Sequence, residues 1–242
     1  LASWTRNFFP VQFLGAYFSL SIAATIGIVL MHFIRFPENR QTVSSNDEGR
    51  PLGAIIRQPI FIVSAICASL GYGLMNLIMA ATPLAMQVCG LPFGDTALVL
   101  EWHVIGMFAP GFFTGSLIKK YGAIPVMSIG VVLNLISITT SLMGNELPFF
   151  LIGLSTLGVA WNFLFTGATT LAMKSYTPSE RDKTQGALNF FVFGVMMFSS
   201  FGSGALVTTQ GWSWINWGSL VPVAITGAAL LWLYKQDPAL HR

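Results

Sequence analysis

The amino-acid sequence predicts an all-α integral membrane protein, built as a polytopic bundle of helices. Charged residues make up 9% of the 242 residues, far below the ~25% of an ordinary globular chain, and hydrophobic residues make up 54%. The apolar residues gather in seven long stretches, and almost all basic residues fall in alternate connections between them. So few charges cannot cover a water-facing surface, which excludes a soluble enzyme, an extended disordered protein and a disulfide-stapled secreted module.

Each apolar stretch matches the about 20 residues with which a helix crosses a bilayer. The predicted spans are, in chain order, 11–34, 59–86, 94–118, 122–144, 148–173, 184–208 and 213–234. Turn-forming residues separate them at 91–95, 121–122, 144–148, 177–178 and 210–211. Membrane strands are excluded because the stretches exceed ~10 residues and are apolar at both odd and even positions. In lipid, a single span satisfies its own backbone hydrogen bonds only as a helix.

The basic residues predict the orientation of these spans. Eleven of the twelve Lys and Arg residues lie between spans one and two, three and four, or five and six, or after span seven, and Arg6 is the exception. The loops near 87–95, 144–148 and 209–212 contain none. By the positive-inside rule, we expect a multi-pass protein of the bacterial inner membrane, with its C-terminus in the cytoplasm.

Residues 35–58 form the one sizeable linker of the sequence. Its Pro, Ser, Asn, Asp, Glu and Gly residues cannot bury a core, so we expect a solvated cytoplasmic tether, although its charges could also serve a function. We therefore expect three parts: span one within 1–34, the linker at 35–58 and a six-helix transmembrane domain at 59–242. The chain begins at Leu1 close to a span, as we expect of the C-terminal portion of a longer membrane protein.

Two predicted cytoplasmic segments resemble signatures of the major facilitator superfamily. The first, Gly-Ser-Leu-Ile-Lys-Lys-Tyr-Gly at 115–122, is similar to the family pattern Gly-x-Leu-x-Asp-Arg/Lys-x-Gly-Arg. The matching positions are Gly115, Leu117, Lys120 and Gly122. Lys119 replaces the acidic residue and Ala123 the last basic one, so the charge-relay role of the acidic residue does not carry over.

The second segment, residues 177–186, is similar to the Pro-x-x-Arg-(x)n-Gly joints of the superfamily through Pro178, Arg181 and Gly186. The resemblance implies a six-helix half of a major facilitator fold preceded by one extra helix, which corresponds to the sixth helix of twelve. It also implies that the missing N-terminal half of the same transporter is a partner. Spans two, three, five and six would then face a central cavity, and spans four and seven, with Asn134 and Asn216, would be peripheral.

Polar residues inside apolar spans are costly to bury and therefore mark candidate functional sites. In span two, Asn76 lies ~15 Å from the outer end, and Tyr72 lies one turn deeper on the same stripe. Both are candidates for contact with a solute near the membrane midplane. The alternative is that the neighbouring Gly71 and Gly73 allow close packing and that Asn76 forms a hydrogen bond across the bundle.

In span three, Glu101 and His103 would lie about 9 and 12 Å below the outer surface. Both are candidates for proton uptake coupled to a conformational change. They are two residues apart and so point in nearly opposite directions. The face of His103 also carries Gly106, Pro110 and Thr114. The face of Glu101 also carries Ile105 and Phe108. The alternative for Glu101 is a position at the depth of the lipid headgroups.

Span five carries Trp161 and Asn162 near its centre, an aromatic ring beside an amide, which suits an organic solute with a flat or apolar body. Packing within the bundle explains the pair equally well. Asn189 enters span six near its cytoplasmic end and is a candidate for the inner part of the same cavity.

Glycines and tryptophans are expected to have structural roles. We expect the glycines in spans three and six to lie at contacts between helices. They are Gly111, Gly115, Gly194, Gly202 and Gly204. We expect the tryptophans at the outer end of span seven to anchor the helix in an aromatic belt. They are Trp212, Trp214 and Trp217.

The patterns that the sequence lacks narrow the function. The three histidines lie far apart in sequence, and no metal-ligand spacing, ATP-binding loop or nucleophile elbow is present. We therefore expect no metal, no cofactor, no nucleic-acid partner and no enzymatic activity. The expected function is secondary active transport of a small organic solute by alternating access, coupled to protons. The alternatives are a non-transporting receptor or scaffold of the same fold and, with less support, a membrane-embedded enzyme.

Overall fold

The computed structural model describes residues 9–10, 14–34 and 49–236. The chain divides into two units, Leu1–Asp47 and Glu48–Arg242. Most of the linker lies outside the described residues, as do Arg6, His241 and Arg242. The first unit contains helix α2, Leu14–Phe33, whose side chains are exposed except near its start.

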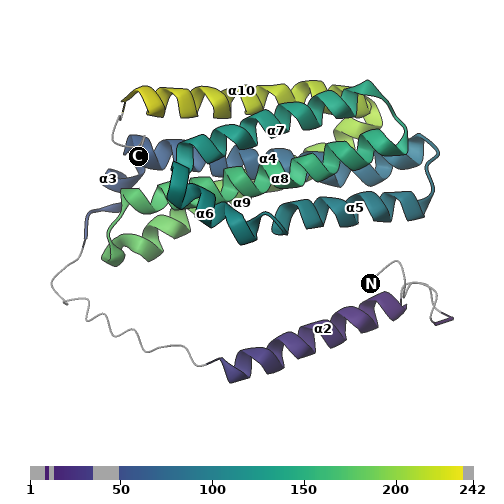
Figure 1. The fold of residues 1–242 in the computed structure, drawn as a ribbon, viewed down its shortest axis with the longest axis horizontal. Coiled ribbons are helices and arrows are strands. Elements are labelled where there is room, and N and C mark those ends of the chain that lie inside the picture. Colours follow the sequence, from purple (N-terminus) through teal and green to yellow (C-terminus); the bar gives the residue numbers. More distant parts are fainter. Residues whose placement is uncertain (1–8, 11–13, 35–48, 237–242) are drawn as a thin grey trace. The chain divides into compact units, whose positions relative to one another are not determined.

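The second unit contains six long apolar segments (Figure 1). Its helices are α3 (Leu52–Ile56), α4 (Pro59–Val88), α5 (Phe93–Phe108), α6 (Gly111–Tyr121), α7 (Ala123–Met143), α8 (Leu147–Ala172), α9 (Arg181–Thr209) and α10 (Trp212–Gln236), with the short 3₁₀ turns η1 (Met173–Ser175) and η2 (Pro178–Glu180) between α8 and α9. With α2, the described part of the chain contains seven segments that are long and apolar enough to cross a membrane. The predicted bundle and its seven spans are confirmed.

The third span consists of two helices. α5 ends at Phe108 and α6 begins at Gly111, with Ala109 and Pro110 between them. Proline has no amide hydrogen, and its ring clashes with the carbonyl of the preceding turn, so a helix breaks or bends there. Since the break lies in the middle of an apolar segment, the backbone groups near it need partners from neighbouring helices.

Helices α4 and α8 lie in the middle of the second unit. α8 packs against α4, α5 and α7, whereas α4 packs against α8, α9 and α10. Figure 1 shows α10 and α7 along one side of this central pair and α5 along the other. The buried core forms two clusters along the helices, one around Phe61 and Leu171 and one around Ile78 and Leu154.

The expectation of a solvated tether is wrong for residues 49–58. This segment contains α3, its Ile55 is fully buried, and Gln58 donates a hydrogen bond to the carbonyl of Ser175 at 2.9 Å. Arg50 forms an ion pair with Glu180 at 2.7 Å. The error arose because composition alone does not show that charged residues have partners elsewhere in the fold.

Gly122 joins α6 to α7 with a backbone φ of 90°. This left-handed region is open to glycine and strained for residues with a side chain. The glycine of the predicted cytoplasmic signature therefore forms the turn between two helices.

Candidate solute-contacting surface

Four aromatic side chains from three helices form the centre of the candidate site. This aromatic cluster consists of Tyr72 of α4, Phe108 of α5, and Trp161 and Phe165 of α8. Trp161 and Phe165 are four residues apart on one helix face, and their rings are stacked with centroids 5.3 Å apart and planes 8° apart. Tyr72 contacts both rings edge-on at 5.4 Å, and Phe108 contacts Trp161 at 6.3 Å. Tyr72 is half-buried and Phe108 is 63% exposed, so the cluster reaches the surface of the second unit.

Trp161 brings a polar group into this apolar cluster. The side chain is 9% exposed, and its indole Nε1 is buried without a hydrogen-bond partner among the described residues. The indole N–H can only donate, and buried donors are nearly always paired in folded proteins. The arrangement provides flat apolar rings and one unused donor, which suits a planar ligand with an acceptor at its edge.

Asn76 lies one turn from Tyr72 on α4 and is half-buried. Its Nδ2 donates to the hydroxyls of Ser199 at 2.9 Å and Ser200 at 2.8 Å on α9. This is the hydrogen bond across the bundle that the sequence offered as the alternative to solute contact. Because this amide joins α4 to α9, a solute that used it would have to compete with the two serines.

Asn162 points into the bundle rather than toward the exposed part of the cluster. Its Nδ2 donates to the carbonyl of Met107 at 2.7 Å, and its Oδ1 accepts from the hydroxyl of Thr114, also at 2.7 Å. Met107 lies at the end of α5 and Thr114 in α6, so the amide spans the break in the third span. Both groups of the amide are occupied, and the structure gives no support to its predicted contact with a solute.

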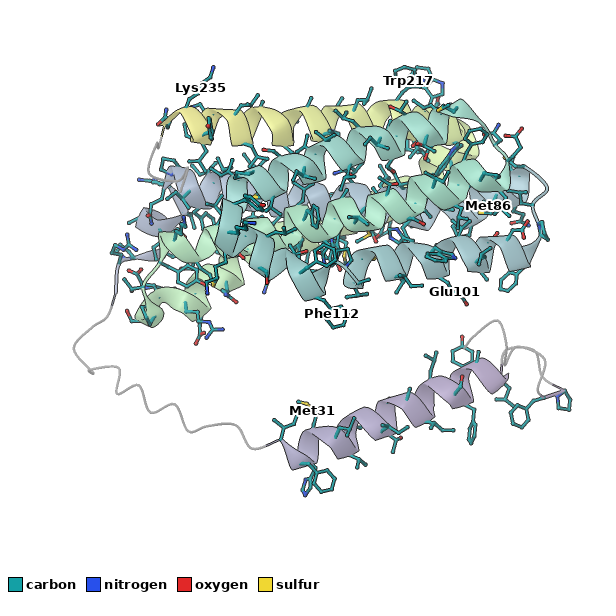
Figure 2. The ribbon with its side chains drawn as sticks, in the orientation of Figure 1. Met31, Met86, Glu101, Phe112, Trp217 and Lys235 are labelled. Atoms are coloured by element: carbon teal, nitrogen blue, oxygen red, sulfur yellow. The ribbon has the colours of Figure 1, made fainter. Side chains whose placement is uncertain are left out.

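Glu101 and His103 lie on opposite faces of α5, as the spacing predicts. His103 is fully buried with Gly106, Pro110 and Thr114. Glu101, which Figure 2 labels on α5, is exposed. Ile105 and Phe108 on the same face are also exposed. Phe108 is a member of the aromatic cluster, so the face that carries Glu101 continues to the candidate site.

His103 lies between α5 and α8. Its Nδ1 is 2.7 Å from the carbonyl oxygen of Leu154, and because a carbonyl only accepts, Nδ1 carries the hydrogen. Its Nε2 is buried without a partner among the described residues. A proton could be placed on Nε2 only if α5 and α8 moved enough to admit one.

Asn189 lies apart from the aromatic cluster. It is exposed near the start of α9, about 15 Å along the helix from Ser199. It lines a small pocket of about 80 Å³ with Thr169, Tyr176 and Gln185. The structure therefore does not bring Asn189 together with the other predicted solute contacts.

The residues of the cytoplasmic signatures lie at helix ends. Lys120 is exposed and lies over the ring of Tyr121 at 5.0 Å, and Arg181 is exposed at the first residue of α9. Apart from its chain neighbours and the nearby backbone of its own helix, no described atom lies within 4 Å of the position that a Cβ on Gly115 would take. Gly194 and Gly204 are equally open, so the predicted helix contacts of these three glycines are wrong within the described structure.

The close helix contact lies elsewhere, at Gly106 of α5 and Gly158 of α8. A Cβ on Gly106 would come within 2.5 Å of the Ser155 carbonyl oxygen, and one on Gly158 would overlap the His103 carbonyl. Sequence reasoning missed this pair, although each glycine lies in the centre of a span.

One predicted belt anchor is also corrected. Trp212 is 7% exposed, packs on Phe150 at 5.2 Å and donates to the Ser141 carbonyl at 3.1 Å. Trp214 and Trp217 are more than half exposed, as a belt position requires. Trp214 and Trp217 lie on one side of the helix, and Trp212 points to nearly the opposite side, so it faces inward.

The sequence did not reveal the clamp formed by Arg50 and Glu180. The Arg50 guanidinium donates to both carboxylate oxygens of Glu180 and to the Ser175 carbonyl, at 2.7 to 3.0 Å. Glu180 also accepts from the backbone N–H of Thr177 in a capping box. The hydrogen bonds to the Glu180 carboxylate, together with its negative charge, raise the pKa of Arg50 above its ordinary value. Among the described residues, no group of three His, Cys, Asp or Glu side chains could hold a metal ion.

Comparison with known proteins identifies the family. The family described as Major Facilitator Superfamily matches residues 65–242. The riboflavin transporter RfnT of Brucella anthropi is 39% identical over 241 residues, which cover 99% of this chain and 61% of the relative. The uncharacterized MFS-type transporter YddS of Bacillus subtilis is 29% identical over 227 residues, which cover 88% of this chain and 50% of the relative.

A more distant relative is the quinolone resistance protein NorB of Staphylococcus aureus, 27% identical over 110 residues, which cover 46% of this chain and 23% of the relative. No solved structure matches the chain. The chain spans about 60% of the first relative and half of the second. RfnT and YddS are named as transporters rather than enzymes, in agreement with the expectation from sequence. The family match over most of the chain and the seven apolar helices agree, and the chain belongs to the major facilitator superfamily.

Proposed function

We propose that this chain is part of a secondary active transporter for a planar, ring-containing organic solute of the riboflavin kind. The observation that carries the proposal is the aromatic cluster, in which Trp161 stacks on Phe165 and its buried N–H has no hydrogen-bond partner among the described residues. The transporter works by alternating access in the bacterial inner membrane, with the solute held near the midplane between the two six-helix halves of the full-length protein. The Lys-rich and Arg-rich ends of the helices, and the C-terminus, face the cytoplasm.

Riboflavin fits the chemistry of the cluster. Its isoalloxazine system is flat, stacks on aromatic side chains and carries carbonyl oxygens that accept hydrogen bonds. The names of two relatives, RfnT and NorB, refer to riboflavin and to quinolones, both of which are planar ring systems with carbonyl groups. In this proposal, Tyr72 and Phe108 border the ring system, and Trp161 donates to one of its carbonyl oxygens.

Transport is coupled to protons through α5 in this proposal. Ionisable residues within membrane spans usually face the protein interior or a water-filled cavity. Glu101, however, lies exposed on the surface of the second unit. A water-filled central cavity beside α5 accounts for that position. Glu101 lies about 10 Å along the helix from Phe108, so a proton on its carboxylate lies close to the solute. His103 is the second candidate and requires separation of α5 from α8.

Uptake of labelled riboflavin by the full-length transporter in proteoliposomes tests the solute. Loss of ring stacking on Trp161→Ala is expected to weaken binding about 5- to 150-fold, from ~1–3 kcal/mol per stacked ring. Trp161→Phe keeps a ring but removes the donor, and is expected to weaken binding about 2- to 10-fold. Trp217→Ala, an exposed tryptophan outside the cluster, is the matched control. Unchanged riboflavin affinity in Trp161→Ala would remove the cluster from the solute site.

Uptake measured with and without an imposed proton gradient tests the coupling. Glu101→Gln is expected to abolish the acceleration by the gradient while riboflavin still binds, because glutamine cannot release a proton. His103→Gln tests the second candidate in the same way, and Glu146→Gln, an exposed carboxylate in the 144–148 loop, is the control. The coupling proposal fails if collapse of the gradient leaves wild-type uptake unchanged.

A further inference from the structure

An apolar groove lies between α7 and α10, away from the aromatic cluster. It has a volume of about 350 Å³, within the ~300–1,000 Å³ of small-molecule sites. Its walls include Ile124, Pro125, Val131, Gly227, Leu230 and Tyr234. The hydroxyl of Ser128, which also lines it, donates to the Ile124 carbonyl of its own helix at 2.9 Å. No charged side chain lines the groove, which suits a hydrocarbon chain.

Gly227 accounts for the space between the two helices. A Cβ at this position would stand 3.6 Å from Val131, at ordinary van der Waals distance, so a larger side chain would occupy the groove without striking the backbone. Val132 and Leu231, which also line the groove, are 54% and 64% exposed. This face of the six-helix unit therefore matches the hydrocarbon of a bilayer.

Three lysines lie close in sequence to Ile124 and Tyr234, which both line the groove. Lys119 and Lys120 occupy the last turn of α6, directly before the turn at Gly122 and the start of α7. Lys235 follows Tyr234 in the last turn of α10, and Figure 2 shows it at the end of that helix. Helices α6, α7 and α10 contain these three lysines and no acidic residue. Asp237 follows in the sequence and lies outside the described residues.

We propose that this groove binds an anionic phospholipid. One acyl chain lies between α7 and α10, and Lys119, Lys120 and Lys235 bind the phosphate of the headgroup. Basic sites between helices at the cytoplasmic side attract such headgroups, and long lysine side chains reach the headgroup level from helix ends. The positive charge of the three lysines complements a negatively charged headgroup, and the apolar lining suits an acyl chain. Together they favour an anionic lipid over a zwitterionic one. The proposal goes beyond the transport function and does not depend on the identity of the solute.

Native mass spectrometry of the full-length transporter tests the site, with phosphatidylglycerol and phosphatidylcholine of identical acyl chains as probes. The wild type is expected to retain phosphatidylglycerol preferentially. In the combined Lys119→Gln, Lys120→Gln and Lys235→Gln variant, the preference for phosphatidylglycerol is expected to fall about a hundredfold, at about fivefold for each lysine. Gly227→Leu fills the groove and is expected to weaken retention of the same lipid. Val132→Phe fills it from α7 and serves if Gly227→Leu does not fold.

Two matched controls separate the site from general effects. Lys174→Gln removes an exposed lysine at the η1 turn, and Gly218→Leu adds the same side chain to an open position of α10. Neither is expected to change lipid retention. The proposal is overturned if the lysine variant keeps its preference, or if both filled grooves retain the lipid normally. It is also overturned if excess sn-glycerol 3-phosphate displaces the lipid, because the site would then bind the phosphate without an acyl chain in the groove. Dissociation of a complex of two copies by Gly227→Leu would overturn it as well, because the groove would then be an interface between copies.

Discussion

At the scale of single residues, two neighbouring buried side chains of α8 differ in whether their polar groups have hydrogen-bond partners. Asn162 uses both ends of its amide to hold the break between α5 and α6. Trp161, its neighbour in sequence, has a buried donor without a partner among the described residues. Adjacent positions on a helix point about 100° apart, so one faces the packed interior while the other borders the candidate site.

Asn162→Ala is expected to destabilise the transporter without altering its solute site. The substitution leaves the Thr114 hydroxyl and the Met107 carbonyl without this partner in a buried setting, which costs about 1–2 kcal/mol. Thermal unfolding in detergent measures the loss, and Asn145→Ala in an exposed loop is the control. Riboflavin affinity per folded molecule is expected to stay at the wild-type value. A lower affinity with unchanged unfolding would instead make Asn162 a solute contact.

The clamp between Arg50 and Glu180 fixes the segment before α4 to the connection between α8 and α9. Lys183 adds a hydrogen bond to the Arg50 carbonyl at 2.6 Å. Removal of the guanidinium in Arg50→Ala is expected to release α3, so its backbone amides exchange hydrogen several-fold faster. Hydrogen–deuterium exchange of the full-length protein measures this, with Arg57→Ala, an exposed arginine of the same segment, as control. Equal protection of α3 in both variants would show that the clamp does not hold it.

At the scale of helices, close approach and breaks decide which faces meet. α5 and α8 touch backbone to backbone at Gly106 and Gly158, which places His103 against Leu154. Pro110 then ends α5, so α6 continues in a second helix. The two features separate the face of Glu101 and Phe108 from the buried face of His103.

Gly158→Ala is expected to separate α5 from α8. The added Cβ would overlap the His103 carbonyl and meet the Met107 amide nitrogen at 2.9 Å, and overpacking of this kind costs about 1–3 kcal/mol. Gly204→Ala on α9 has open space around it and is expected to leave stability unchanged. The unfolding midpoint of the full-length transporter in detergent compares the two variants. Equal midpoints would argue against the close contact of α5 and α8.

At the scale of the whole second unit, burial is uneven. In the most apolar stretch of α4, 61% of the residues are buried. In the corresponding stretch of the span that contains α9, only 17% are buried. α9 instead exposes a row of phenylalanines, and α5 exposes Glu101 and Phe108. A surface that mixes a carboxylate with aromatic rings fits neither bulk lipid nor water alone. It fits the cavity side of a transporter unit, as proposed above.

The proposed orientation places Cys89 on the periplasmic side of the inner membrane. Cys89 is exposed in the 87–95 loop, which has no basic residue, whereas Cys67 is buried. A membrane-impermeant maleimide added to intact cells is expected to label Cys89, but not a cysteine introduced by Ser179→Cys between α8 and α9. Asn145→Cys, in another loop without basic residues, is expected to behave like Cys89. Labelling of Cys89 and position 179 from the same side would contradict the topology.

The number of spans, their approximate ends, the opposed faces of Glu101 and His103, and the family resemblance could all be predicted from the amino-acid sequence. These follow from composition and helical period, since a lipid-spanning segment must be apolar and must bond its own backbone. The packing of the helices was needed to see which polar groups are already paired, which glycines lie at contacts, and that Tyr72, Phe108, Trp161 and Phe165 form one cluster. Those facts depend on which helix faces which, and nothing in the period of a single span specifies its neighbour, because every face of such a span is almost equally apolar.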